Sequence, residues 1–191
     1  MAEIDDILSF WFARPGEAEY GERREIWWRS TPEFDAEIGA RFTGACERAA
    51  AGELERWAED ARGCLALILL FDQFPRNLYR GTPRAFATDA RALQLAEDAV
   101  ARGFEQEMTL LERVFFYTPF EHSERLEDQR RGVALFQALG DDPLVRESVR
   151  LATRHLEIIE RFGRFPHRNE ILGRDSTAEE AAFLTEPESS F

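Results

Sequence analysis

The chain has 191 residues, of which 44% are hydrophobic and 12% aromatic, enough to build one folded domain without disulfides or metals. Its 37 acidic and 24 basic residues give a formal net charge of −13, which disfavours binding to nucleic acids or to anionic membranes. Every basic residue is an arginine, so chemistry that needs a lysine, such as Schiff-base formation or a phosphate-loop lysine, is excluded.

Apolar residues recur at spacings of three and four along the chain, which is typical of α-helices, and no segment shows a sustained period of two. A capping residue followed by proline predicts helix starts at Thr31-Pro32, Thr82-Pro83, Thr118-Pro119 and Asp142-Pro143. Glu121 would complete a capping box at the third start, and Ser176 with Glu179 predicts a fifth. Glycines that can take the left-handed conformation predict helix ends at Gly52, Gly103, Gly140 and Gly163.

These signals predict helices near residues 3–13, 32–51, 62–73, 83–102, 107–117, 119–139, 143–162 and 177–184. Short connections between them predict an all-α fold of about eight helices, arranged as stacked antiparallel helical hairpins. We expect one domain over residues 1–191, with residues after about 185 forming a loose tail, and we assign no element to residues 14–30.

The start of the chain, MAEIDDILSFWF, carries acids where a signal peptide needs basic residues. The longest apolar run, Cys64 to Phe71, is too short to span a bilayer. Cys46 and Cys64 lie in apolar helical segments without metal-ligand or redox spacing, as expected for core thiols in a reducing compartment. We therefore expect a cytoplasmic protein with neither a membrane nor a nucleic acid as its partner.

Several polar residues fall on the apolar faces of the predicted helices. Asp89 lies on the stripe of the helix from Pro83, and His122 and Gln129 both lie on the stripe of the helix from Pro119. Asp72 ends the run CLALILLF, where an unpartnered carboxylate would be costly. His155 is expected to be a core histidine with its hydrogen bonds satisfied. The four tryptophans are expected in the core or in a pocket wall: Trp11, Trp27, Trp28 and Trp57.

Two similar stretches, DQFPRN at 72–77 and RFPHRN at 164–169, follow strongly apolar segments. We interpret both Phe-Pro pairs as helix-ending turns, because proline cannot donate a backbone hydrogen bond. The turns are predicted to bring arginines and amides together around Asp72, Asp89 and His122. The candidate ligand-binding residues are Asp72, Arg76, Asn77, Asp89, Gln129, Arg164, His167, Arg168, Asn169 and Arg174.

The strings LALILLFDQFPRNLYRGTPRAFATDARAL, PFEHSERLEDQ and IIERFGRFPHRNEILGRDSTAEE, with an opening FWF and WW, resemble the bacterial domain of unknown function 924 family. The resemblance runs essentially from end to end. It implies an all-helical fold similar to tetratricopeptide-like helix-pair proteins, and it implies no established activity. The residues that match the family's pattern are Asp72, Gln73, Phe74, Pro75, Arg76, Asn77, Asp89, His122, Ser123, Glu124, Gln129, His155, Gly163, Arg164, Phe165, Pro166, His167, Arg168, Asn169, Gly173 and Arg174.

Three functions are compatible with these residues. The first is a binding module whose arginines hold the carboxylate or phosphate of a small ligand or peptide terminus. The second is a hydrolase-like enzyme in which His122 is the catalytic general acid or base on a small anionic substrate, oriented by Asp72 or Asp89. The third is an architectural protein that docks a protein partner, in which the carboxylates and arginines are buried ion pairs.

No cofactor is predicted. A metal site of Asp72, Asp89 and His122 would be assembled in space alone, because the three residues lack close ligand spacing in the sequence, and we predict no metal.

Overall fold

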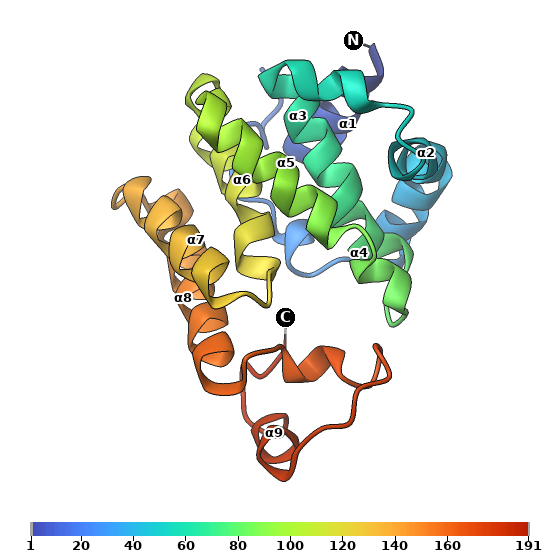
Figure 1. The fold of residues 1–191 in the computed structure, drawn as a ribbon. Coiled ribbons are helices and arrows are strands. Elements are labelled where there is room, and N and C mark those ends of the chain that lie inside the picture. The colour runs from blue at the N-terminus through green and yellow to red at the C-terminus, as the bar shows by residue number, and fades with distance from the viewer. Residues whose placement is uncertain (1, 191) are drawn as a thin grey trace.

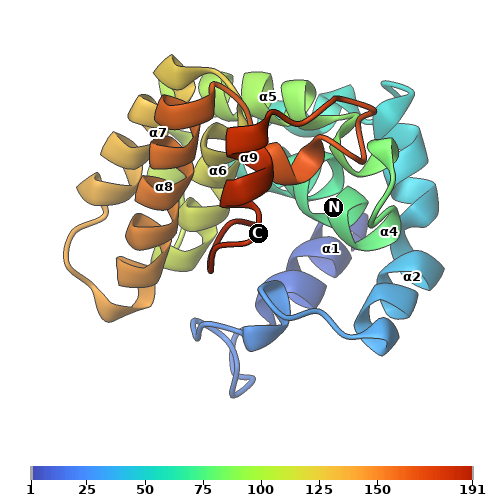
Figure 2. The same ribbon diagram turned by 90° about the horizontal axis from the view of Figure 1, so that it is seen from below.

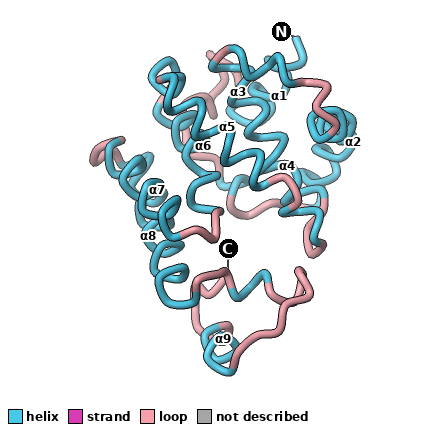
Figure 3. The backbone as a smooth tube through the Cα atoms, viewed as in Figure 1, coloured by secondary structure: helices cyan, strands magenta, loops and turns pink. Residues whose placement is uncertain are grey.

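The computed structural model describes residues 2–190, and no strand occurs among them (Figures 1 and 3). This confirms the prediction of an all-α chain, while the tetratricopeptide-like stacking of hairpins stays a prediction. The α-helices are α1 (Ala2–Phe12), α2 (Pro32–Ala50), α3 (Ala61–Ile68), α4 (Phe74–Leu78), α5 (Asp89–Arg102), α6 (Leu110–His122), α7 (Leu126–Ala138), α8 (Pro143–Phe162) and α9 (Ala178–Phe183). Short 3-10 helices are η1 (Glu25–Trp27), η2 (Glu55–Glu59), η4 (Pro83–Phe86), η5 (Phe104–Glu107) and η6 (Pro166–Arg168), and a π-helical turn, η3, covers Leu69–Gln73.

The main hydrophobic core lies where α1, α2, α3, α5 and α6 meet, with α3 and α5 side by side in its middle (Figure 1). Large side chains from five helices are almost completely buried in it: Trp11, Ile38, Leu65, Phe74, Phe115 and Phe116. Within the described chain, no helix is both long enough and apolar enough to cross a membrane.

The C-terminal segment, after α8, crosses the lower side of the molecule toward the α4 end (Figures 1 and 2). Phe165 and Phe183 anchor it in a second hydrophobic cluster with Ile158 and Ile159 of α8. Gly163 ends α8 in the left-handed conformation, as predicted, with φ of 69°. The RFPHRN stretch is therefore held beneath the helical body rather than projecting into solvent.

Two predicted helix starts are confirmed by their capping geometry. The side chain of Thr31 accepts a hydrogen bond from the amide of Phe34, and Asp142 accepts one from Leu144. The start predicted at Ser176 lies one residue too early, because Thr177 forms the capping box of α9 with Glu180.

The start predicted at Thr118-Pro119 is wrong, because both residues lie inside α6. Thr109 caps this helix, and Thr118 donates its hydroxyl to the carbonyl oxygen of Val114 at 2.9 Å instead of capping an amide. Helix α6 ends at His122, where the side-chain amide of Gln129 donates to the carbonyls of Glu121 and Ser123, both at 2.6 Å. This contact satisfies carbonyls that have no partner within the helix.

The start predicted at Thr82-Pro83 opens the short 3-10 helix η4, and α5 begins later, at Asp89. Asp89 therefore occupies the first turn of its helix and not the second. A carboxylate is favoured there by the partial positive charge of the helix N-terminus.

Phe74-Pro75 does not end a helix, which corrects the prediction for the first quoted stretch. The chain stays helical from Ala61 to Leu78 because the π turn η3 lets Phe74 donate to the carbonyl of Leu69, five residues earlier. Proline at 75 cannot donate to Phe71, and the hydroxyl of Thr88 donates to that carbonyl instead, at 2.6 Å. Asp72 consequently lies within a continuous helical segment, not at a helix C-terminus, and its side chain faces the interior.

Candidate functional site

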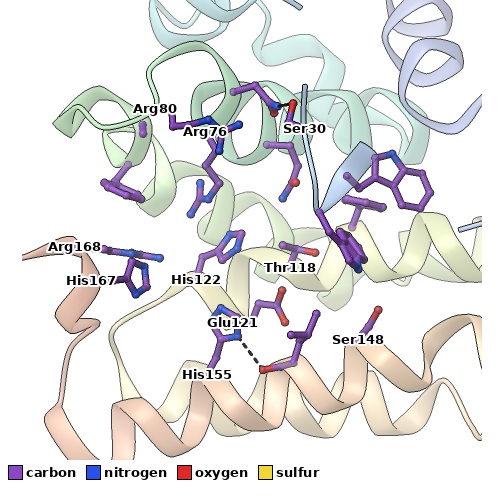
Figure 4. A pocket seen from close by; sticks show the side chains of 18 of the residues that line it. Ser30, Arg76, Arg80, Thr118, Glu121, His122, Ser148, His155, His167 and Arg168 are labelled. Atoms are coloured by element: carbon purple, nitrogen blue, oxygen red, sulfur yellow. Dashed lines mark hydrogen bonds between the residues drawn. The ribbon is translucent and has the colours of Figure 1, made fainter. Parts of the chain in front are cut away.

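A cavity of about 420 Å³ lies among η1, α4, η4, α6, α8 and η6, which is a volume usual for small-molecule sites (Figure 4). In Figure 4, Arg168 and His167 lie on one side of His122, and Thr118 and Ser148 lie on the other. The wall is made by Trp27, Trp28, Ser30, Gln73, Arg76, Asn77, Arg80, Gly81, Ala85, Phe86, Val114, Phe115, Thr118, Glu121, His122, Glu147, Ser148, Leu151, His155, His167, Arg168 and Ile171.

Asp72 lies directly behind this wall and is completely buried. Its Oδ1 accepts from Nδ1 of His122 at 2.6 Å and lies 3.2 Å from Nη1 of Arg76, while Oδ2 accepts from Gln73 at 2.5 Å. Burial opposes ionisation of Asp72, but attraction to Arg76 and His122 and these hydrogen bonds outweigh it and hold its pKa below the usual range. Asp72 is therefore a carboxylate throughout the neutral range.

His122 receives its orientation from Asp72. Because a carboxylate only accepts hydrogen bonds, Nδ1 of His122 carries the proton, which leaves Nε2 for the pocket. Burial, followed by repulsion from Arg76, lowers the pKa of His122 despite the opposing attraction of Asp72. A neutral imidazole with an oriented, basic Nε2 can accept a proton from a bound molecule.

Arg76 joins two carboxylates. Its two terminal nitrogens donate to the two oxygens of Asp89 at 2.9 and 3.0 Å, and Nη1 also donates to the backbone oxygen of Asp72 at 2.6 Å. Attraction to both acids raises the pKa of Arg76 although burial opposes it. Arg76 is thus a structural counter-ion that already holds two carboxylates of the protein.

Arg168 is held differently, although it reaches the same carboxylate. It is 6% exposed, and its nearest acceptor is Oδ2 of Asp89 at 3.5 Å, which the fork of Arg76 already occupies. Its guanidinium carbon lies 4.7 Å from the ring centre of Phe86 and 4.5 Å from that of Phe165. Within the part of the chain that the structure describes, Nε of Arg168 is buried without a hydrogen-bond partner.

Burial, followed by repulsion from Arg76, lowers the pKa of Arg168 to about 10, so the side chain remains cationic at neutral pH. A buried cation with an unpaired donor on a cavity wall is costly unless something else binds it.

Glu121 precedes His122 on α6, and its carboxyl group also lies on the cavity wall. Its Oε2 is buried and meets no hydrogen-bonding group among residues 2–190. Burial, followed by the negative charge of Asp72, raises the pKa of Glu121 to about 8 against the attraction of Arg76. Glu121 is therefore mostly a neutral carboxylic acid at pH 7. The charged or titratable side chains around it, on the wall or directly behind it, are Asp72, Arg76, Arg80, Asp89, His122, Glu147, His155, His167 and Arg168.

Two further histidines line the cavity. Nδ1 of His155 donates to the carbonyl of Leu151 at 2.8 Å, as expected for a satisfied core histidine. Burial is the main reason that the pKa of His155 falls to about 3 and that of His167 to about 4, and nearby positive charge lowers both further. Both rings are neutral at pH 7 and add no charge to the site.

The wall also has an aromatic part. The ring of Trp27 lies 4.9 Å from Phe115 and that of Trp28 lies 6.3 Å from it, between ring centres. The indole of Trp27 donates to the carbonyl of Trp11 at 3.0 Å, which fixes its position. Trp28 remains 41% exposed. Of the four tryptophans expected in the core or in a pocket wall, Trp27 and Trp28 therefore line the cavity.

Asn77 lines the cavity as well, and its amide donates to Asp35 at 2.7 Å and to Ser30 at 3.1 Å. These contacts tie the segment after η1 to α4. Six of the predicted ligand-binding residues, together with His122, therefore meet at or directly behind one cavity: Asp72, Arg76, Asn77, Asp89, His167 and Arg168.

The other four predicted site residues do not reach the cavity wall. Arg164 is paired with Glu180, at 2.6 and 2.8 Å, and Arg174 with Glu124, at 2.7 and 2.9 Å. Gln129 closes the end of α6, as described above. These contacts dock the C-terminal segment and α7, because each arginine meets a nearer acid than those around Asp72. Asn169 donates to Ser176 at 3.0 Å.

Several wall residues were not among the predicted ligand-binding residues, and Glu121 is the most consequential. Its sequence signal was its position beside His122 in the apolar segment FFYTPFEH, but it was interpreted as the capping partner of Thr118. Ser30 and Phe86 carry no local signal of their role, because long-range packing alone brings them to the wall. No group of three or more His, Cys, Asp or Glu side chains in the described chain is arranged to hold a metal ion.

Both a solved structure and a family model match this chain. A protein of unknown function from Agrobacterium tumefaciens, ATU0120, has a similar solved structure, with a TM-score of 0.85 and 41% sequence identity over 96% of this chain and 97% of that chain. No curated protein matches. Residues 7–188 match the family described as bacterial protein of unknown function (DUF924), and the chain therefore belongs to this family.

Proposed function

We propose that the cavity binds a small organic anion, with Arg168 as the residue that holds its charged group. The observation that supports this most is the state of Arg168: a buried cation on the cavity wall whose Nε has no partner among the described residues. Its one ion contact, to Asp89, is long, and Arg76 already occupies the same carboxylate. An anion in the cavity would give the guanidinium of Arg168 an acceptor that it does not share with Arg76.

The two flanking rings support the same role. The guanidinium of Arg168 contacts the rings of both Phe86 and Phe165, so little side-chain freedom is left to lose when a ligand binds. A purely structural counter-ion would instead face its carboxylate with two short hydrogen bonds, as Arg76 does.

The test is thermal unfolding of the wild-type protein in a series of small carboxylates, because selective binding to the native state raises the melting temperature. We expect at least one carboxylate to stabilise the wild type and to leave the Arg168→Met variant unaffected. Arg130→Met is the matched control, since this arginine is exposed and lies outside the cavity wall. Equal stabilisation of both variants and the wild type would refute the proposal.

A second candidate function, a hydrolase-like enzyme acting on such an anion, is favoured by the 2.6 Å contact between Nδ1 of His122 and Asp72. In this function His122 would activate water as a general base, with its imidazolium form stabilised by Asp72. Turnover of anionic esters or amides that is lost in His122→Gln, while ligand-induced stabilisation is kept, would establish it. Turnover that survives this substitution would exclude the role of His122.

A further inference from the structure

We infer that the anion is a small monocarboxylate with an apolar body about the size of an aromatic ring. This inference rests on the proposed function and specifies the ligand class for the same cavity. Two independent features of the wall support it, the balance of fixed charges and the aromatic part of the wall.

The first feature is the balance of charge around the site. The fixed charges next to the candidate anion position are two guanidinium groups, Arg76 and Arg168, and two carboxylates, Asp72 and Asp89, so they sum to zero. A monoanion adds one negative charge to this buried cluster, whereas a phosphate dianion adds two beside both carboxylates. Because charge repulsion is weakly screened at buried sites, the monoanion is strongly preferred.

Glu121 supports the same choice. As a neutral acid on the wall, with its Oε2 unpaired among the described residues, it does not repel an anion and can donate one hydrogen bond to an acceptor oxygen. The other two arginines on the wall each have a carboxylate partner within the protein already. Arg76 holds Asp89, and Arg80 is paired with Asp35 at 3.3 Å.

The second feature is the apolar part of the cavity. Trp27, Trp28 and Phe115 contact one another through their rings and line the same space. Aliphatic wall residues extend this surface, namely Val114, Leu151 and Ile171. A cavity of about 420 Å³ is larger than a bare carboxylate or phosphate ion needs. Burying a ring against this surface adds favourable hydrophobic contact that such ions cannot make.

The experiment compares four probes by calorimetric titration at pH 7: phenylacetate, acetate, phenyl phosphate and the neutral phenylacetamide. We expect phenylacetate to bind about 10- to 100-fold more tightly than acetate, because its ring enters the aromatic part of the wall. Phenyl phosphate should bind at least about 10-fold more weakly than phenylacetate, because its second negative charge is repelled by Asp72 and Asp89. Phenylacetamide should bind at least about 10-fold more weakly as well, because it has no negative charge for Arg168 to hold.

Two variants test the contacts of the ligand's ring and of its carboxylate separately. Trp28 is partly exposed, so the Trp28→Ala variant should fold. It should bind phenylacetate more weakly than the wild type does and bind acetate equally well. Arg168→Met should weaken the binding of both phenylacetate and acetate. If phenyl phosphate or acetate binds as tightly as phenylacetate and still depends on Arg168, the ligand class is wrong but the anion site stands. If none of the anions binds, or if Arg168→Met has no effect, the proposed function itself fails.

Discussion

Arg76 and Arg168 both contact Asp89, and the structure predicts opposite consequences when each is replaced by methionine. Arg76 supplies two hydrogen bonds to Asp89 and lies 3.2 Å from the fully buried carboxylate of Asp72. Its removal leaves two carboxylates without their cation. Breaking a buried ion pair by removing one partner costs about 3–5 kcal/mol, so we expect a loss of this size for Arg76→Met.

Arg168→Met should lower the free energy of unfolding by no more than about 1 kcal/mol. The lost 3.5 Å contact to Asp89 is weak because Arg76 remains, and the lost contacts with Phe86 and Phe165 are worth about 0.5–2 kcal/mol. Nε of Arg168 is a buried donor without a partner among the described residues. Its removal stabilises the folded state by about 1–3 kcal/mol, which offsets that loss. Methionine also retains most of the apolar stem that packs between the rings.

Urea unfolding followed by far-ultraviolet circular dichroism measures both values, provided that the dependence on urea is equal in all variants. The exposed Arg130→Met variant again gives the baseline. If Arg168→Met destabilises the protein as much as Arg76→Met does, then Arg168 is a structural counter-ion. The distinction on which the proposed site depends would then be wrong.

Three further measurements probe the site and its frame. The pKa of Glu121 is raised to about 8 in the folded protein, so folding favours its protonated form. Its contribution to the free energy of unfolding is fully present below about pH 4.5, and it is lost as the pH rises through about 8. Glu121→Gln should therefore be more stable than the wild type at pH 9 by about 4–5 kcal/mol, and at pH 5 by less than about 1 kcal/mol. Equal pH profiles would show that the carboxyl group ionises normally. Asp72→Asn should cost about 3 kcal/mol in urea unfolding, because the buried guanidinium of Arg76 loses one of its two carboxylate partners, and a near-neutral effect would contradict the assigned ion pairing. Gly63→Ala should destabilise by about 1–3 kcal/mol or more, since its Cβ would lie 2.2 Å from the carbonyl oxygen of Trp57, whereas Gly44→Ala, with open space around it in α2, should stabilise by about 0.5–1 kcal/mol. A thermal melt that ranks these two glycine variants in the reverse order would contradict the packing of η2 on α3.

The sequence predicted the fold class and several helix boundaries because those depend on local chemistry. Thr31 and Asp142 cap their helices because their side chains accept from the unpaired amides of the first helical turn. Gly163 takes the left-handed conformation at the end of α8. The failures came at prolines. Pro75 and Pro119 signal breaks locally, but the helices continue through them, and Thr88, from another segment, donates to the carbonyl that Pro75 leaves free.

For the site, the sequence by itself indicated three polar residues that face the interior, because Asp72, Asp89 and His122 stand on or at the end of apolar faces. Only the tertiary structure decided which partner each arginine meets. Arg164 and Arg174 carry the same charge and flank the same loop as Arg168, yet they reach Glu180 and Glu124. The cause is physical: an arginine is drawn by short-range geometry to whichever carboxylate the packing brings within hydrogen-bond reach, and spacing along the chain does not encode that distance.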